Sequence, residues 1–222
     1  MGLDRCGIAG MVLLVGLGGC SAGPNVREGY SLAKAGGDGK GVLVLSLSTD
    51  NPDNAFIPQL TFNYGTMPHG EKDEITLRGP GGCDKDKPEA SDFGATCGRL
   101  FVVELPAGDY YLYPWALTLF PPIRQCTPLG WEPIRFSIIA GKGTYVGEFR
   151  TQLGDAGQTS IGMTKFGSAW VVSSDAHKRD FALLAQRYPD IGADAMQVVP
   201  AAFPVKTVGN APKDSNCGGA GG

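Results

Sequence analysis

The chain has 222 residues, 42% of them hydrophobic and 18% charged, and a formal net charge of −3 at pH 7. This composition supports a buried core and excludes a disordered chain, and the length suits one domain with extensions or at most two small ones. There is no run of lysine and arginine, which excludes nucleic acid as an expected partner. The 34 glycines and 16 prolines predict many turns and therefore many short strands.

The N-terminus is typical of an export signal that ends at a cysteine. Arg5 and the start amine give it a positive start, and residues 8–17 are apolar but too few to span a bilayer, which takes about 20. The sequence LGGC at 17–20 resembles the lipobox of bacterial lipoproteins. In that family the signal is cleaved before the cysteine, which is acylated on its thiol and on its new amine. An ordinary signal in which Cys20 is incidental is the alternative.

We therefore expect residues 1–19 to be the signal, Cys20 to be lipidated, and the membrane to be a partner through its acyl chains. Ser21 follows the cysteine where an aspartate would indicate inner-membrane retention, so the expected location is the outer membrane of a bacterial envelope, facing the periplasm. Residues 20–40 are rich in glycine and small polar residues and are expected to form a flexible tether.

Alternating or β-branched runs then recur with turn signals between them, at 41–48, 59–65, 74–78, 99–105, 109–117, 134–140, 144–150 and 168–174. The turns at 106–109 and 140–143 are short enough to join antiparallel neighbours. These features predict an all-β domain over 41–203, an antiparallel β-sandwich of the transthyretin or immunoglobulin-like type, with 195–203 as a possible last strand. The glycine-rich tail, 204–222, is expected to be loose except where a cysteine ties it.

One stretch breaks the period of two. Residues 175–188 carry apolar side chains at helical spacing, at Phe181, Leu184 and Tyr188. Ser174 or Asp175 can cap the start, and Pro189 marks the stop. The prediction is one amphipathic helix that packs on the sandwich.

The number of cysteines predicts two disulfides. Four cysteines remain after the signal and Cys20 are set aside: Cys83, Cys97, Cys126 and Cys217. An even number in an exported chain indicates disulfides, and four cysteines allow three connectivities. Cys83–Cys97 is the local choice, a closure of about 15 residues that is worth about 3 kcal/mol in the chain-entropy model. Cys126–Cys217 would then tie the tail to the body.

Three quoted stretches resemble a known family: GRLFVVELPAGDYYLYPW (98–115), IRFSIIAGKGTYVGEFR (134–150) and DFALLAQRYPDI (180–191). Their order is similar to that of uncharacterised bacterial envelope lipoproteins with a transthyretin-like (prealbumin-like) sandwich, over about residues 41–192. The shared motifs are turn motifs, and no catalytic residues come with them. This sequence departs from the pattern in the loop that holds Cys83 and Cys97, in the Pro-rich loop 118–133, and in the tail.

Motifs for catalysis and for metal binding fail on inspection. The two GK sequences lack the glycine that a P-loop needs five positions earlier, and GQTSIG at 157–162 has the wrong spacing for a nucleophile elbow. His177 lies near Asp175 and Asp180, but at the start of the expected helix. The acidic loop 84–92 interleaves its acids with lysines, and there is no CxxC pair for a metal. We expect no enzyme activity, no cofactor and no metal.

Aromatic residues are dense around the strand at 109–117, and the candidates for binding are Tyr110, Tyr111, Tyr113, Trp115 and Trp131. Alternation places Tyr111, Tyr113 and Trp115 on one face and Tyr110 on the other. One half of an alternating strand faces the core and the other half faces outward. Trp115 and Tyr110 are the candidates for outward-facing binding residues. Exposed tyrosine and tryptophan suit a protein partner or a glycan.

The function expected from the sequence is that of a membrane-anchored, non-catalytic envelope lipoprotein, a structural or protein-interaction module with an envelope protein as partner. The alternative is a module that binds a glycan or a small ligand. An envelope hydrolase is the third possibility.

Overall fold

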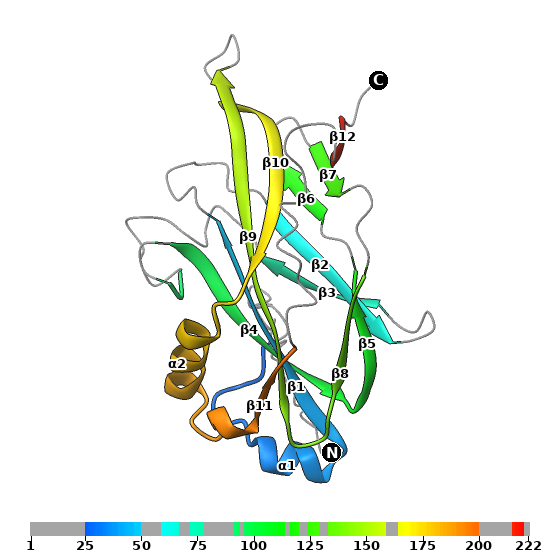
Figure 1. Ribbon diagram of the computed structural model, residues 1–222, viewed down its shortest axis with the longest axis vertical. Coiled ribbons are helices and arrows are strands. Elements are labelled where there is room, and N and C mark those ends of the chain that lie inside the picture. Colours follow the sequence, from blue (N-terminus) through cyan, green and yellow to red (C-terminus); the bar gives the residue numbers. More distant parts are fainter. Residues whose placement is uncertain are drawn as a thin grey trace, which may run out of the picture.

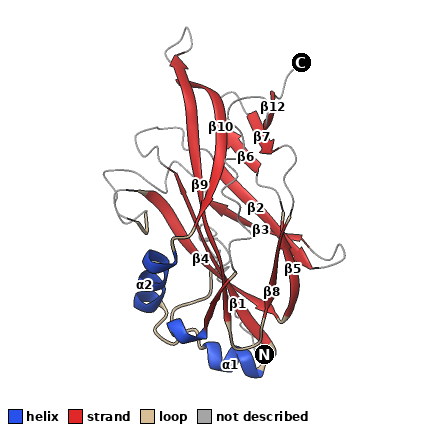
Figure 2. Cartoon of the chain, viewed as in Figure 1, coloured by secondary structure: helices blue, strands red, loops and turns tan. Residues whose placement is uncertain are grey.

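The computed structural model describes residues 25–49, 59–66, 72–77, 91–93, 96–113, 116–119, 124–128, 133–158, 164–199 and 215–219. Strands dominate, and they build two sheets with helices on one side (Figures 1 and 2). The predicted β-sandwich with an amphipathic helix near the C-terminus is confirmed.

Sheet A has the strand order β10-β9-β1-β4, and the short β11 also pairs with β9. Its strands are β1 (Lys40–Thr49), β4 (Cys97–Pro106), β9 (Gly143–Gln158), β10 (Thr164–Ser174) and β11 (Met196–Val198). β1 is antiparallel to β4 but parallel to β9. It is buried along both faces, which explains why its sequence begins as a continuous apolar run.

Sheet B has the strand order β12-β7-β6-β2-β5-β8, and β3 also pairs with β2. Its strands are β2 (Gln59–Thr66), β3 (Lys72–Leu77), β5 (Gly108–Leu112), β6 (Ala116–Leu119), β7 (Arg124–Pro128), β8 (Ile134–Ile138) and β12 (Ser215–Gly219). All its pairings are antiparallel. β12 is thus a strand within the predicted loose tail.

The turns at 106–109 and 140–143 cross between the sheets, so the prediction that each joins antiparallel neighbours is wrong. β4 pairs with β1 in sheet A, whereas β5 pairs with β2 and β8 in sheet B. The second turn likewise leads from β8 in sheet B to β9 in sheet A. Gly141 has a φ of 70° there, as a tight turn requires.

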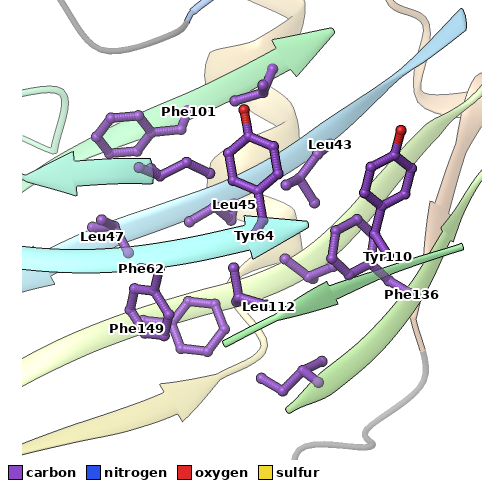
Figure 3. Packing of buried hydrophobic residues seen from close by; sticks show 14 of the residues in the cluster. Leu43, Leu45, Leu47, Phe62, Tyr64, Phe101, Tyr110, Leu112, Phe136 and Phe149 are labelled. Carbon is purple, nitrogen blue, oxygen red and sulfur yellow. The ribbon is translucent and has the colours of Figure 1, made fainter. Parts of the chain in front are cut away.

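The main core lies between the sheets. Leu43, Leu45 and Leu47 of β1 lie in this core together with Phe62 and Tyr64 of sheet B (Figure 3). Phe62 packs on Phe149 of β9 with ring centroids 4.5 Å apart. These contacts bury the period-two face that the sequence predicted.

A second apolar cluster covers the outer face of sheet A. It is built by α1 (Leu32–Gly37), α2 (His177–Arg187) and the residues after α2, which include the 3-10 helix η2 (Ala193–Ala195). Leu184 and Tyr188 pack there against Val44 and Tyr145, as the helical spacing predicted.

The start of α2 differs in detail from the prediction. Ala176 is the N-cap and no side chain caps it, although the carboxylate of Asp175 accepts a hydrogen bond from the backbone N–H of His177 at 3.1 Å. Ser174 does not cap the helix, because its hydroxyl is used by Glu148 of β9.

The predicted tether over 20–40 is also corrected. From Asn25 onward the chain packs on the domain, and Leu32 and Ala35 of α1 are only 2% and 4% exposed. Ser31 caps this short helix by accepting from the backbone N–H of Lys34. Glycine-rich composition hid the helix, because its two buried apolar residues are too few to give a period.

Candidate functional site

Two carboxylates, Glu148 of β9 and Asp180 of α2, are buried on the outer face of sheet A, with 1% and 0% of their surface exposed. A β-bulge explains the position of Glu148. The register between β1 and β9 shifts between Val44 and Ser46, and Gly147 has a φ of 108° at that point. The extra residue places Glu148 on the same face as Tyr145, three positions earlier.

Glu148 is surrounded by donors from four segments. Its Oε1 accepts from the hydroxyl of Ser48 at 2.7 Å and from Nη1 of Arg179 at 2.9 Å. Its Oε2 accepts from the hydroxyl of Ser174 at 3.0 Å and from Nη2 of Arg150 at 3.2 Å. Burial by itself would raise the pKa of Glu148, but the hydrogen bonds from Ser48 and Arg179 and the nearby arginine charges outweigh it, so the pKa is lowered.

Asp180 is held in the same way. Its Oδ2 accepts from the hydroxyls of Ser46 and Tyr145, both at 2.7 Å. Its Oδ1 accepts from Nε of Arg179 at 2.8 Å. Burial and the charge of Asp180 raise the pKa of the Tyr145 hydroxyl, which therefore stays protonated and donates.

Arg179 bridges the two carboxylates. Besides these bonds, its Nη2 donates to the hydroxyl of Ser46 at 3.0 Å, and its guanidinium lies over the ring of Phe93, 3.8 Å from the centroid. Burial would lower its pKa, but the two carboxylates raise it overall, so the arginine stays charged. The guanidinium is thus fixed on its flat face by Phe93 and at its edges by acceptors.

In this buried cluster (Ser46, Ser48, Tyr145, Glu148, Ser174, Arg179 and Asp180), and with Arg150 at its edge, the chain itself supplies the hydrogen-bond donors to both carboxylates. A carboxylate has about four acceptor sites. Glu148 fills four with donors of this chain, and Asp180 fills at least three. The arrangement can lock the start of α2 onto β1 and β9.

His177 lies outside this cluster, at the exposed start of α2. Its Nδ1 is 2.7 Å from the carboxylate of Asp175, and its side chain is 37% exposed. The ring also lies near Phe181, with centroids 5.7 Å apart. The pair is a local contact within the first turn.

The outer face of sheet B carries two of the predicted aromatic candidates. Tyr111 and Tyr113 are half-buried there, with ring centroids 6.2 Å apart. The guanidinium of Arg135, directly across in β8, lies 5.4 Å from the centroid of Tyr111. Asn63 and Glu74 face each other on the neighbouring strands β2 and β3. We call Asn63, Glu74, Tyr111, Tyr113 and Arg135 the aromatic face.

Tyr110 is not part of that face, and its prediction as an outward-facing binding residue is wrong. It is 5% exposed, and its ring stacks on Phe136 in the core at 5.7 Å between centroids (Figure 3). Its hydroxyl donates to the carbonyl of Pro106 at 3.0 Å, which satisfies the polar atom and secures the crossing between the sheets. Trp115 and Trp131 lie outside the described residues.

Three of the predicted cysteines lie in the described part of the chain, and two lie outside it. Cys97 begins β4, is buried and is disulfide-bonded, while Cys20 and Cys83 lie outside the described residues. Cys126 of β7 and Cys217 of β12 are directly opposite in the antiparallel register. Such neighbours have Cα atoms about 4.5–5.5 Å apart, within the range a disulfide spans. Both pairings stay predictions.

Among the described residues, no group of three or more histidine, cysteine, aspartate or glutamate side chains could hold a metal ion. No helix in the same part of the chain is long and apolar enough to cross a membrane.

The chain matches no protein-family model and no curated protein. One solved structure, named "Putative cell adhesion protein" from Parabacteroides distasonis, is similar at 11% identity and a TM-score of 0.30. The match covers 60% of this chain and 40% of that one. At this TM-score the similarity carries no argument about function.

Proposed function

We propose that the chain is a membrane-anchored, non-catalytic envelope lipoprotein that acts as a structural or protein-interaction module. The observation that carries the proposal is that both carboxylates of the buried cluster accept their hydrogen bonds from side chains of the chain itself. Its two carboxylates are the buried charged side chains of the described chain, and the hydrogen bonds they accept come from within the domain. A group that serves as acid or base needs room for a substrate atom beside it.

The anchor rests on the sequence before Cys20. The apolar run at 8–17 and the LGGC at 17–20 support acylation of this cysteine, and Ser21 supports transfer to the outer membrane, facing the periplasm. Mass spectrometry of the mature N-terminus tests it, and a Cys20→Ala chain should be released or left uncut. An unmodified Cys20, or cleavage elsewhere, contradicts the anchor.

The partner is proposed to be an envelope protein that binds the aromatic face. Half-buried tyrosines beside an arginine are the residue types enriched at protein interfaces. In a crosslinking capture from detergent-solubilised envelope, one protein should be enriched by the native chain and lost with Tyr111→Ser/Tyr113→Ser. Lys178→Ala, an exposed change on α2, is the matched control and should keep it. Equal capture by both variants contradicts this assignment.

A glycan or small polar ligand is the second candidate for the same face. Tyr111 and Tyr113 offer rings for stacking, and Asn63, Glu74 and Arg135 offer hydrogen-bond groups around them. Titration calorimetry with envelope oligosaccharides separates this candidate from a protein partner. Saturable heat that Tyr111→Ser abolishes would favour the glycan.

Disulfides Cys83–Cys97 and Cys126–Cys217 are proposed to hold the body together in the oxidising periplasm. Peptide mapping without reduction should recover both pairs. Recovery of free thiols at Cys126 and Cys217 would contradict the second.

A further inference from the structure

The segment that begins the described chain covers the outer edge of β4. The backbone N–H of Val26 donates to the carbonyl of Val102 at 2.8 Å. The side chain of Asn25 completes the pairing, because its oxygen accepts from the N–H of Val102 at 2.7 Å and its amide donates to the carbonyl of Leu100 at 3.3 Å. Asn25 therefore acts as a peptide group would in an added strand.

The same segment is held from α2. The hydroxyl of Tyr188, at the end of α2, donates to the carbonyl of Val26 at 3.1 Å. Farther along, Leu32 is buried under sheet A. Asn25 is thus a fixed point on the surface, between the edge of β4 and the C-terminal end of α2.

Chain length then limits where the domain sits. Four residues separate Cys20 from Asn25. An extended chain spans at most about 3.6 Å per residue, so the two Cα atoms are within about 18 Å whatever the conformation between them. A free tether from Cys20 to Lys40 would reach about 70 Å by the same measure.

We propose that the edge of β4 and the C-terminal end of α2 face the lipid head groups, which turns the aromatic face away from the bilayer. This rests on the proposed anchor at Cys20. β10 lies three strands farther along sheet A, about 14 Å from β4 at usual strand spacing. Sheet B packs about 10 Å from sheet A, on the face opposite α2. The long β9 and β10 project past the other strands (Figure 1).

The residues beside the fixed point suit head groups rather than acyl chains. Arg27 and Glu28 are exposed, and Arg187 pairs with Asp92 at 2.6 Å. The exposed large apolar residues of the described chain, Ile139 and Val198, belong to the β8–β9 turn and to β11. The bilayer contact is therefore a polar one that the anchor imposes.

The test uses the full acylated protein on vesicles of phosphatidylethanolamine and phosphatidylglycerol that carry an acceptor dye on a head group. A donor dye is placed, through an unnatural amino acid, at position 28 or at position 135. Energy transfer should be severalfold higher from position 28. A spacer of about 20 glycine and serine residues inserted between Pro24 and Asn25 should abolish that difference, since such a linker is a flexible coil.

The outcomes separate the two proposals. Protein that floats with the vesicles but shows equal transfer from both positions, or no response to the spacer, overturns the orientation and leaves the anchor standing. Protein that fails to float overturns the anchor, and the orientation with it.

Discussion

β1, inside sheet A, is buried on both of its faces, with different chemistry on each. Toward sheet B, β1 presents leucines that meet aromatic rings, and the contacts are apolar. Toward α2, the same strand presents Val42 and Val44 and then Ser46 and Ser48, and the last two end in the buried charged cluster. The inner layer is held mostly by apolar burial, while the outer layer is held by burial and by a network of directed hydrogen bonds.

The two layers contribute differently to the fold. An apolar layer accepts many packings, so it supplies stability more than a unique position. The cluster under α2 has fixed donors and acceptors, so it sets where the helix sits. We expect it also to make the outer layer more sensitive to acid than the inner layer, because the hydrogen bonds and arginines around Glu148 lower the pKa of that carboxyl.

The largest expected effect is in the inner layer. Phe62→Ala should lower the free energy of unfolding by about 3–5 kcal/mol, because Phe62 is fully buried against Phe149. Urea unfolding measures it. Ile139→Ala, an apolar truncation at a residue 48% exposed, is the control and should change little. A small loss for Phe62→Ala would show that the sheets are not packed as described.

The next effect is in the apolar part of the outer layer. Leu184→Ala should cost about 2–5 kcal/mol, since Leu184 is 1% exposed beneath α2. The melting temperature should fall clearly, whereas Gln186→Ala, exposed on the same helix, should leave it unchanged. A native melting curve for Leu184→Ala would mean that α2 does not dock on sheet A.

A change in the charged part of the outer layer should cost less stability, and its effect should be confined to α2. Asp180→Asn replaces an acceptor of three donors, and hydrogen bonds to charged groups are worth about 1.5–3 kcal/mol. Hydrogen exchange should show α2 opening before the strands of sheet A. Asp190→Asn, at an exposed site, is the matched control. Uniform loss of protection in both layers would contradict a separate role for the cluster.

Acid should weaken the outer layer through Glu148. Its pKa is lowered from an ordinary 4.5, so its charge stabilises the fold fully above pH 4.5, and that contribution is lost as pH falls through the lowered pKa. Urea midpoints at about pH 7 and about pH 3 should differ less in Glu148→Gln than in the native chain. Glu74→Gln, exposed on β3, should keep the native difference. Identical pH profiles for Glu148→Gln and the native chain would rule out the linkage.

The smallest effect is expected at His177. His177→Ala should change stability by no more than about 0.5 kcal/mol, because the ring is partly exposed in the first turn of α2. A thermal melt measures it. A folded His177→Ala chain that loses its envelope phenotype would instead favour catalysis.

The sequence predicted the strands that alternate and the helix that follows them. The runs at 41–48 and 134–140 became β1 and β8, and Phe181, Leu184 and Tyr188 took the inward side of α2. Local periodicity carried this information. It carried no information on pairing partners, so the parallel alignment of β1 with β9 was not foreseen.

The buried cluster was missed because its members are polar and far apart in sequence. Ser46 and Asp180 are 134 positions apart, and each looks like a surface residue by itself. A signal did exist at Gly147, where a glycine inside a strand pattern indicates a bulge and moves Glu148 to the other face. The serines that alternate at 46 and 48 on a wholly buried strand are the second signal.

In our proposal the partner binds the aromatic face, while the buried cluster serves only to hold α2 on sheet A. The most direct measurement compares envelope partner capture by folded Tyr111→Ser/Tyr113→Ser and by folded Glu148→Gln. The first variant should lose the partner and the second should keep it. A partner or an activity that depends on Glu148 and survives the loss of both tyrosines would contradict it.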